Sequence, residues 1–178
     1  MKTPTKEQLT QRLNQCFQET IDWVMDQPDA HFNKEIVAGK WTIAEQLYHL
    51  IKTSKAVSKG MSMPKLALRT MFGKNKNTER SYQDILDLYR SKLASTKAKA
   101  PKAYEAEPGR TFERDNLIKR LQDEQKDFIT ALNKWNENDM SVYQMPHPIV
   151  GKFTIREFVY FTILHTYHHL DILKEQYA

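Results

Sequence analysis

Residues 154–177 of the chain are TIREFVYFTILHTYHHLDILKEQY, a stretch whose first half is strongly apolar. A helix that is apolar on most sides is usually buried at the centre of a helical domain. Thr154 and Glu157 have the spacing of a capping box, in which each side chain bonds the backbone N–H of the other residue. We therefore expect a central helix from Thr154 to about Tyr177.

Outside this stretch, apolar residues recur at helical spacing in several further segments. The chain has only five glycines and seven prolines, so few residues are available to punctuate many short strands. Residues 97–110 are expected to form a polar linker and residues 136–152 a loop, and no pair of strands is expected. The predicted helices cover residues 5–27, 42–63, 65–72, 81–93 and 111–135.

These patterns predict an all-α fold, an antiparallel four-helix bundle with extra short helices. The length of 178 residues, of which 40% are hydrophobic, fits a single domain spanning residues 1–178. A homodimer is compatible with the apolar helices, although no residue in the sequence specifies it.

Charge and composition argue against several classes of protein. The net charge is +5, and part of it lies in two clusters, residues 65–80 and 92–102. Because neither cluster is accompanied by stacking aromatic residues or a groove-reading motif, we expect a solvated surface and not a nucleic-acid interface. The sequence contains no run of about 18 apolar residues, and its N-terminus lacks the apolar core of a secretory signal. We therefore expect a cytoplasmic protein without membrane association.

Cys16 is the one cysteine of the chain, so the sequence excludes both a disulfide within the chain and a zinc site built from cysteines. It lies in the apolar stripe of the first predicted helix. A cysteine in such a stripe is typically a core residue, and we favour this role over that of a nucleophile.

Two stretches of the sequence resemble each other, AGKWTIAE at residues 38–45 and VGKFTIRE at residues 150–157. Each has a Gly-Lys-aromatic lead-in, then a Thr and, three residues on, a Glu, so both predict a helix that begins with a capping box. Two unrelated helices that begin with the same favourable capping residues would also show this likeness.

The positions of three histidines can be compared by counting from these caps. His49 lies seven residues after the first Thr, and His165 and His169 lie eleven and fifteen after the second. These intervals differ by four residues, about one helical turn, so the three histidines share roughly one angular face relative to their caps.

His49, His165 and His169 are therefore the candidate metal ligands. His165 and His169 are four residues apart, which places both imidazoles on one face of a helix, and His49 can supply a third ligand from a neighbouring helix. Three histidines and an open position are typical of catalytic zinc, and nickel and iron also accept imidazole ligands. Spacing leaves two alternatives open: hydrogen-bonded core histidines, and a pair formed by His165 and His168.

Two further residues are considered for the site. Glu45 lies one turn before His49, and its expected role is that of a helix cap. It is also the candidate general base and a candidate hydrogen-bonding partner for the His49 ring. His147 lies between Pro146 and Pro148, where packing of the loop and a functional role fit the pattern equally well.

Three parts of the sequence together resemble the DinB-like superfamily, a group of metalloenzyme bundles that includes the YfiT-like proteins. They are WTIAEQLYHL at residues 41–50, HPIVGKFTIREF at residues 147–158 and HTYHHL at residues 165–170. The resemblance covers most of the chain. It implies a four-helix bundle in which the three candidate ligands hold a metal ion.

The resemblance also implies a class of reaction. Some members of the superfamily are transferases or isomerases that depend on low-molecular-weight thiols such as bacillithiol or mycothiol. A metal ion would then activate a cofactor thiol for attack on an electrophile. Many relatives have Arg-Gly-Gln-type residues after the second histidine, whereas this chain has Leu-Asp-Ile at residues 170–172, so the identity of the thiol stays open.

Three functions are considered for the chain. The first is a divalent-metal-dependent thiol S-transferase that acts on a small molecule. The second is metal-assisted hydrolysis by water, with Glu45 as the general base. The third is a non-catalytic, stress-related binding module whose basic clusters are its working surface.

Overall fold

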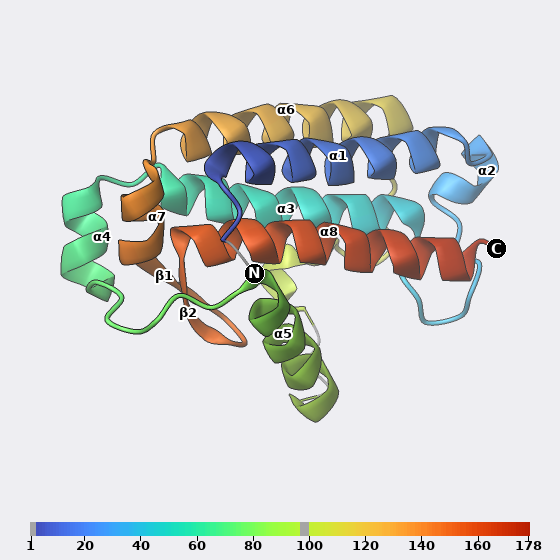
Figure 1. The fold of residues 1–178 in the computed structure, drawn as a ribbon. Helices are drawn as coiled ribbons and strands as arrows, with labels where there is room; N and C mark the ends of the chain where they lie inside the picture. The colour runs from blue at the N-terminus through green and yellow to red at the C-terminus, as the bar shows by residue number, and fades with distance from the viewer. Residues whose placement is uncertain (1–2, 97–99) are drawn as a thin grey trace.

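Four long helices lie side by side and form the body of the protein (Figure 1). They are α1 (Lys6–Met25), α3 (Ile43–Met61), α6 (Arg114–Asn133) and α8 (Ile155–Gln176). In the computed structural model, which describes residues 3–96 and 100–178, α1 and α3 both pack against α6 and α8. The predicted all-α four-helix bundle is therefore confirmed.

Shorter elements connect the long helices, and the sequence predicted two of them, the helices at residues 65–72 and 81–93. They are α2 (Asp29–Phe32), α4 (Lys65–Phe72), α5 (Tyr82–Thr96), the 3-10 turn η1 (Lys102–Tyr104) and α7 (Glu137–Val142). The helix α5 packs against α8 and projects away from the bundle in Figure 1. The start of the predicted linker, residues 97–99, lies outside the described residues. The later part of the linker includes η1, which contacts α3.

The two related stretches of sequence begin their helices in the same way. The side-chain oxygen of Thr42 accepts a hydrogen bond from the backbone N–H of Glu45 at 3.1 Å, and the carboxylate of Glu45 accepts one from the N–H of Thr42 at 2.8 Å. At Thr154 and Glu157 the corresponding distances are 3.2 and 2.8 Å. Both predicted capping boxes are confirmed, so α3 and α8 start with the same local geometry.

The helix α8 is buried along most of its length, as its apolar composition predicts. Every residue from Ile155 to Thr166 is buried, including the charged Arg156 and Glu157. Both charges have partners: Arg156 bonds Glu137 at 2.6 Å, and Glu157 bonds Arg80. Neither α8, with its 22 residues, nor any other helix in the described ranges is apolar enough over its length to span a membrane.

Glu124 is an acidic residue of α6 that is buried against α3. Only 4% of the surface of this residue is exposed, and its carboxylate accepts a hydrogen bond from the hydroxyl of Ser58 at 2.6 Å. Burial raises the pKa of Glu124, while the bond from Ser58 opposes the rise. The folded state therefore holds the proton of this carboxyl group more tightly than the unfolded chain does.

This raised pKa predicts a pH-dependent effect of Glu124→Gln. The contribution of Glu124 to stability is present below the unfolded carboxyl pKa of about 4.3 and is lost as the pH rises through the raised folded value. We expect Glu124→Gln to raise the melting temperature near pH 7, by a margin that disappears near pH 4. Thermal unfolding followed by circular dichroism measures both values. The matched control is Asp127→Asn, which changes an exposed charge on the same helix. An equal effect of Glu124→Gln at both pH values would contradict the prediction.

The expectation of a loop over residues 136–152 is wrong. The segment contains α7 and a hairpin of two antiparallel strands, β1 (Gln144–His147) and β2 (Gly151–Thr154), in which His147 pairs with Gly151. Each strand has only four residues, and Pro146 interrupts β1, so the alternation of apolar and polar residues is too short to recognise.

The turn of this hairpin is closed by a side chain and not by a tight-turn dipeptide. The Nδ1 atom of His147 accepts hydrogen bonds from the backbone N–H groups of Ile149 at 3.2 Å and Val150 at 3.4 Å. Gly151 then takes a φ of 91°, a conformation that favours glycine. A turn held in this way carries no Asn-Gly or Gly-Gly signal, which is why the sequence pattern did not reveal it.

Candidate metal site and adjoining cavity

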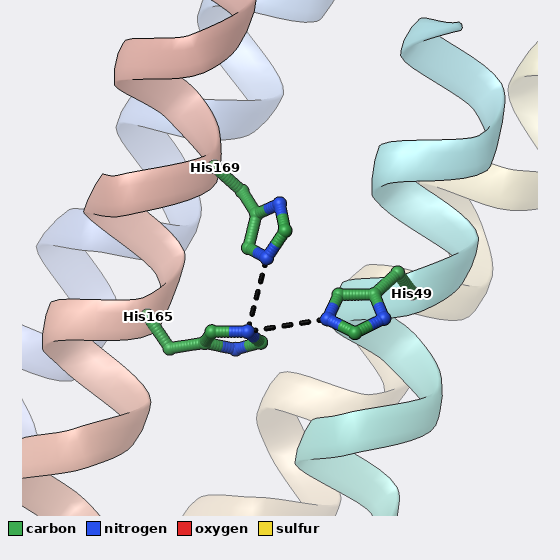
Figure 2. A group of neighbouring side chains, drawn as sticks. All are labelled: His49, His165 and His169. Atoms are coloured by element: carbon green, nitrogen blue, oxygen red, sulfur yellow. Dashed lines mark hydrogen bonds between the residues drawn. The ribbon is translucent and has the colours of Figure 1, made fainter. Parts of the chain in front are cut away.

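The structure brings together the three histidines that the helical spacing selected (Figure 2). His165 and His169 lie on α8, and His49 faces them from α3. The Nε2 atom of His165 lies 3.1 Å from Nε2 of His49 and 3.0 Å from Nε2 of His169. All three residues are buried, with 4–7% of their surface exposed. Three ring nitrogens from two helices thus face one another in the interior.

The outer nitrogens of two of these rings are hydrogen-bonded to other parts of the chain. Nδ1 of His49 donates to the backbone carbonyl of Tyr104 at 3.1 Å, and Nδ1 of His169 donates to the side-chain oxygen of Gln46. An imidazole that donates through Nδ1 and is neutral has a free lone pair on Nε2. Both Nε2 lone pairs therefore point towards His165. Metal-binding histidines are commonly oriented in this way, by a hydrogen bond from the other ring nitrogen to a neighbouring group.

This arrangement fits a divalent metal ion. Nitrogen ligands at the usual zinc distance of about 2.0–2.1 Å lie roughly 3.3 Å apart in a tetrahedron. The ligand atoms of the three histidines all lie within 4.8 Å of one another. Without a cation, the one Nε2 proton that neutral His165 can supply would be shared between two acceptors. A cation at the common point would instead satisfy all three lone pairs.

Burial also keeps these histidines in the form that binds metals. Desolvation lowers the pKa of His49 to about 4. Desolvation and the neighbouring histidines hold the pKa of His165 and His169 well below 6.5. All three imidazoles are therefore neutral near pH 7, with no bound proton to compete with a metal ion.

A cavity of about 310 Å³ adjoins the histidines, which form part of its wall. Its remaining wall comes from α3, α5, α8, the hairpin and the segment around η1. None of the described residues that line it is an Asp, Glu, Lys or Arg. Most of the lining side chains are aromatic or aliphatic, among them Trp41, Val57, Tyr89, Met145, Phe158 and Phe161.

The sequence profile of the DinB superfamily matches residues 12–173, which include all three histidines of the cluster. The chain belongs to the DinB superfamily. This confirms the family that the histidine motifs predicted.

The fold of this DinB-superfamily chain is also found in a solved structure. YfiT from Bacillus subtilis is 16% identical and aligns over 99% of this chain and 89% of its own, with a TM-score of 0.62. That protein is described as a probable metal-dependent hydrolase with an unusual four-helix bundle topology. At this identity the likeness shows a shared fold. No curated protein sequence matches the chain significantly.

Within this DinB-superfamily fold, Glu45 serves as a helix cap. Its carboxylate accepts the N–H of Thr42, and Glu45 is not among the residues that line the cavity. The outer partners of His49 and His169 are instead Tyr104 and the neighbouring Gln46. A role of Glu45 as general base stays a prediction.

The other histidines lie in different surroundings. His168 is exposed at the edge of the cavity and lies outside the group of three. The ring of His31 packs against Tyr177, with 6.0 Å between their centroids. His147 lines the cavity and also holds the hairpin turn through its Nδ1 atom, so a functional role of this residue stays a prediction. Sequence reasoning missed Gln46 and Tyr104, because neither has a spacing signal that ties it to a histidine.

Cys16 is a core residue, as its place in an apolar stripe predicts. Its side chain is fully buried in α1, its thiol donates to the carbonyl of Leu13 at 3.2 Å, and burial raises its pKa to about 12.

We expect alkylation of Cys16 to be at least about 100-fold slower in the folded protein than in denaturant, because the reaction requires opening of the core. Mass spectrometry after timed iodoacetamide treatment measures both rates. Comparable rates would show that the thiol is accessible in the native fold.

Proposed function

We propose that this chain is a divalent-metal-dependent enzyme that activates a nucleophile for attack on a small molecule. The observation that carries the proposal is the convergence of three buried, neutral histidines at the wall of a cavity. Zinc, nickel and iron all suit such a ligand set. An ion held there would supply a Lewis acid, which lowers the pKa of a water or thiol that binds to it.

Each part of the chain then has a separate task. His49, His165 and His169 would hold the ion, while Gln46 and the Tyr104 carbonyl fix the orientation of two of the rings. The apolar cavity excludes water from the reacting groups and binds the substrate.

The reaction we favour is the attack of a thiol from solution on an electrophilic small molecule. No carboxylate is found among the described cavity residues to act as a general base for water. A thiol needs less help, because its ordinary pKa of about 8.5 lies far below the value of about 15.7 for water. Cys16 is too deeply buried to be the nucleophile. The thiol would therefore be a low-molecular-weight co-substrate, and the chain a thiol S-transferase.

Hydrolysis is the second candidate, and the description of YfiT as a probable metal-dependent hydrolase favours it. A metal ion alone can bring the pKa of bound water to about 7, so a carboxylate base is not obligatory.

Metal analysis and paired assays test the proposal. Elemental analysis is expected to find about one divalent ion per chain. The protein is used without a tag, because a tag would add its own histidines. The loaded protein is then incubated with electrophiles, with and without a low-molecular-weight thiol. Turnover that requires thiol supports the transferase, and turnover without thiol supports the hydrolase. Turnover that persists undiminished in His49→Ala would reject metal-dependent catalysis, with His31→Ala as the control.

A further inference from the structure

We infer that the cavity beside the three histidines takes an uncharged, aromatic small molecule, and that the Nε2–H of His147 donates a hydrogen bond to an acceptor atom of that molecule. The inference names the substrate class and therefore rests on the proposed function. It is carried by three observations: the absence of charge on the described wall, the aromatic rings of that wall, and the hydrogen bonding of His147.

Away from the three histidines that would hold a metal ion, the described cavity wall offers no counter-ion. None of the described lining residues is an Asp, Glu, Lys or Arg, and burial lowers the pKa of His147, which is outside the group of three, to about 4. Moving an isolated charge from water into such surroundings is costly. The body of the substrate is therefore uncharged.

Flat aromatic surfaces surround the space. The ring of Phe161 stacks on that of His165, with centroids 5.0 Å apart and 18° between the planes. The ring of Trp41 lies 5.1 Å from that of His49. Rings already arranged in this way can stack with an inserted ring or meet it edge to face. At about 310 Å³ the cavity is at the lower end of the usual range for small-molecule sites, which suits a ligand of one or two rings.

His147 supplies a polar group to this largely apolar wall. Its Nδ1 accepts from the N–H groups of Ile149 and Val150, so the proton of the neutral ring is on Nε2. In the part of the chain that the structure describes, Nε2 has no hydrogen-bonding partner. The ring packs edge-on against Phe161, with 4.4 Å between centroids, and Phe161 in turn stacks on His165. A molecule lying over Phe161 would thus reach both His147 and the histidine cluster.

Four probes of nearly one shape test this inference: benzamide, benzoate, benzamidinium and isopropylbenzene. Their dissociation constants are measured by NMR titration of the full chain after chelator treatment, so that no metal ion can attract benzoate. We expect benzamide to bind at least about 10-fold tighter than either charged probe. We expect it to bind about 3- to 10-fold tighter than isopropylbenzene, which has no acceptor. Equal or tighter binding of a charged probe would overturn the inference.

Two variants of His147 separate its donor from its structural role. Asn keeps an acceptor near the position of Nδ1 and removes the Nε2 donor, whereas Gln keeps a donor near the position of Nε2. We expect His147→Asn to abolish the preference for benzamide over isopropylbenzene, and His147→Gln to retain it. His31→Asn is the control, because His31 lies outside the cavity lining. Thermal unfolding establishes that each variant is folded. An unchanged preference in folded His147→Asn would overturn the role of His147.

These measurements are independent of the proposed function. A chain that binds no divalent ion but selects benzamide would refute the metal enzyme and leave the inference standing. A chain that binds zinc but none of the four probes would refute the inference and leave the metal site standing.

Discussion

Replacing His165 with alanine is expected to lower the affinity of the chain for Zn²⁺ by more than about 100-fold. Its Nε2 lies between the Nε2 atoms of His49 and His169, at 3.1 and 3.0 Å, so it is the shared member of the candidate ligand set. Loss of an outer partner typically costs about 10–100-fold in metal affinity, and loss of a ligand should cost more. Competition with a chromophoric chelator measures the affinity.

A graded series of variants makes this prediction specific. Gln46→Ala removes the outer partner of His169 and is expected to cost about 10–100-fold. His168→Ala changes a histidine that is adjacent in sequence but outside the group of three, and it should bind Zn²⁺ as the unchanged chain does. If His168→Ala lost as much affinity as His165→Ala, the alternative pair on α8 would be the ligands.

The sequence predicted the parts of this site that depend on local geometry. Capping boxes at Thr42 and Thr154 set where α3 and α8 begin, and a four-residue spacing places His165 and His169 on one face. The face of α3 on which His49 lies could also be inferred, because His49 is counted from Thr42 in the same way as the other two histidines are counted from Thr154. Its meeting with the α8 histidines depends on how the helices pack, which spacing alone does not specify.

The parts that sequence reasoning missed depend on contacts between distant segments. Tyr104 lies 55 residues from His49, in a segment that its composition identifies only as a polar linker, and it contributes a backbone carbonyl that any residue would supply. His147 reaches the cavity because a hairpin of two four-residue strands carries it there. Neither strand is long enough to show a pattern of alternating residues.

Arg80 shows how such a distant contact can determine the architecture around the site. Its Nε and Nη2 atoms donate to the two carboxylate oxygens of Glu157 at 2.8 and 2.7 Å, and Nη2 also donates to the carbonyl of Lys152 at 2.9 Å. Arg80 lies two residues before the start of α5, whereas Lys152 belongs to the hairpin and Glu157 to α8. One guanidinium thus joins three elements that line the cavity.

We expect Arg80→Ala to reduce the free energy of unfolding by about 3–5 kcal/mol, because it leaves a buried carboxylate without its counter-ion. Only 2% of the Glu157 side chain is exposed, so water cannot replace the lost partner. Arg80→Lys should recover part of the loss, since lysine keeps the charge but not the two-pronged geometry. Chemical denaturation measures both values.

The related helix start provides the matched control for this prediction. Glu45 makes the same capping box as Glu157 but is only partly buried, so Glu45→Ala should cost only the cap, about 0.3–1.5 kcal/mol. If Arg80→Ala cost no more than Glu45→Ala, the ion pair would add little to folding, and the apolar packing of α8 would be what positions α5 and the hairpin. A large difference would instead mean that the two helix starts contribute unequally to stability although their sequences are nearly the same. The reason would be that only Glu157 has an arginine partner, which lies 77 residues away in the sequence.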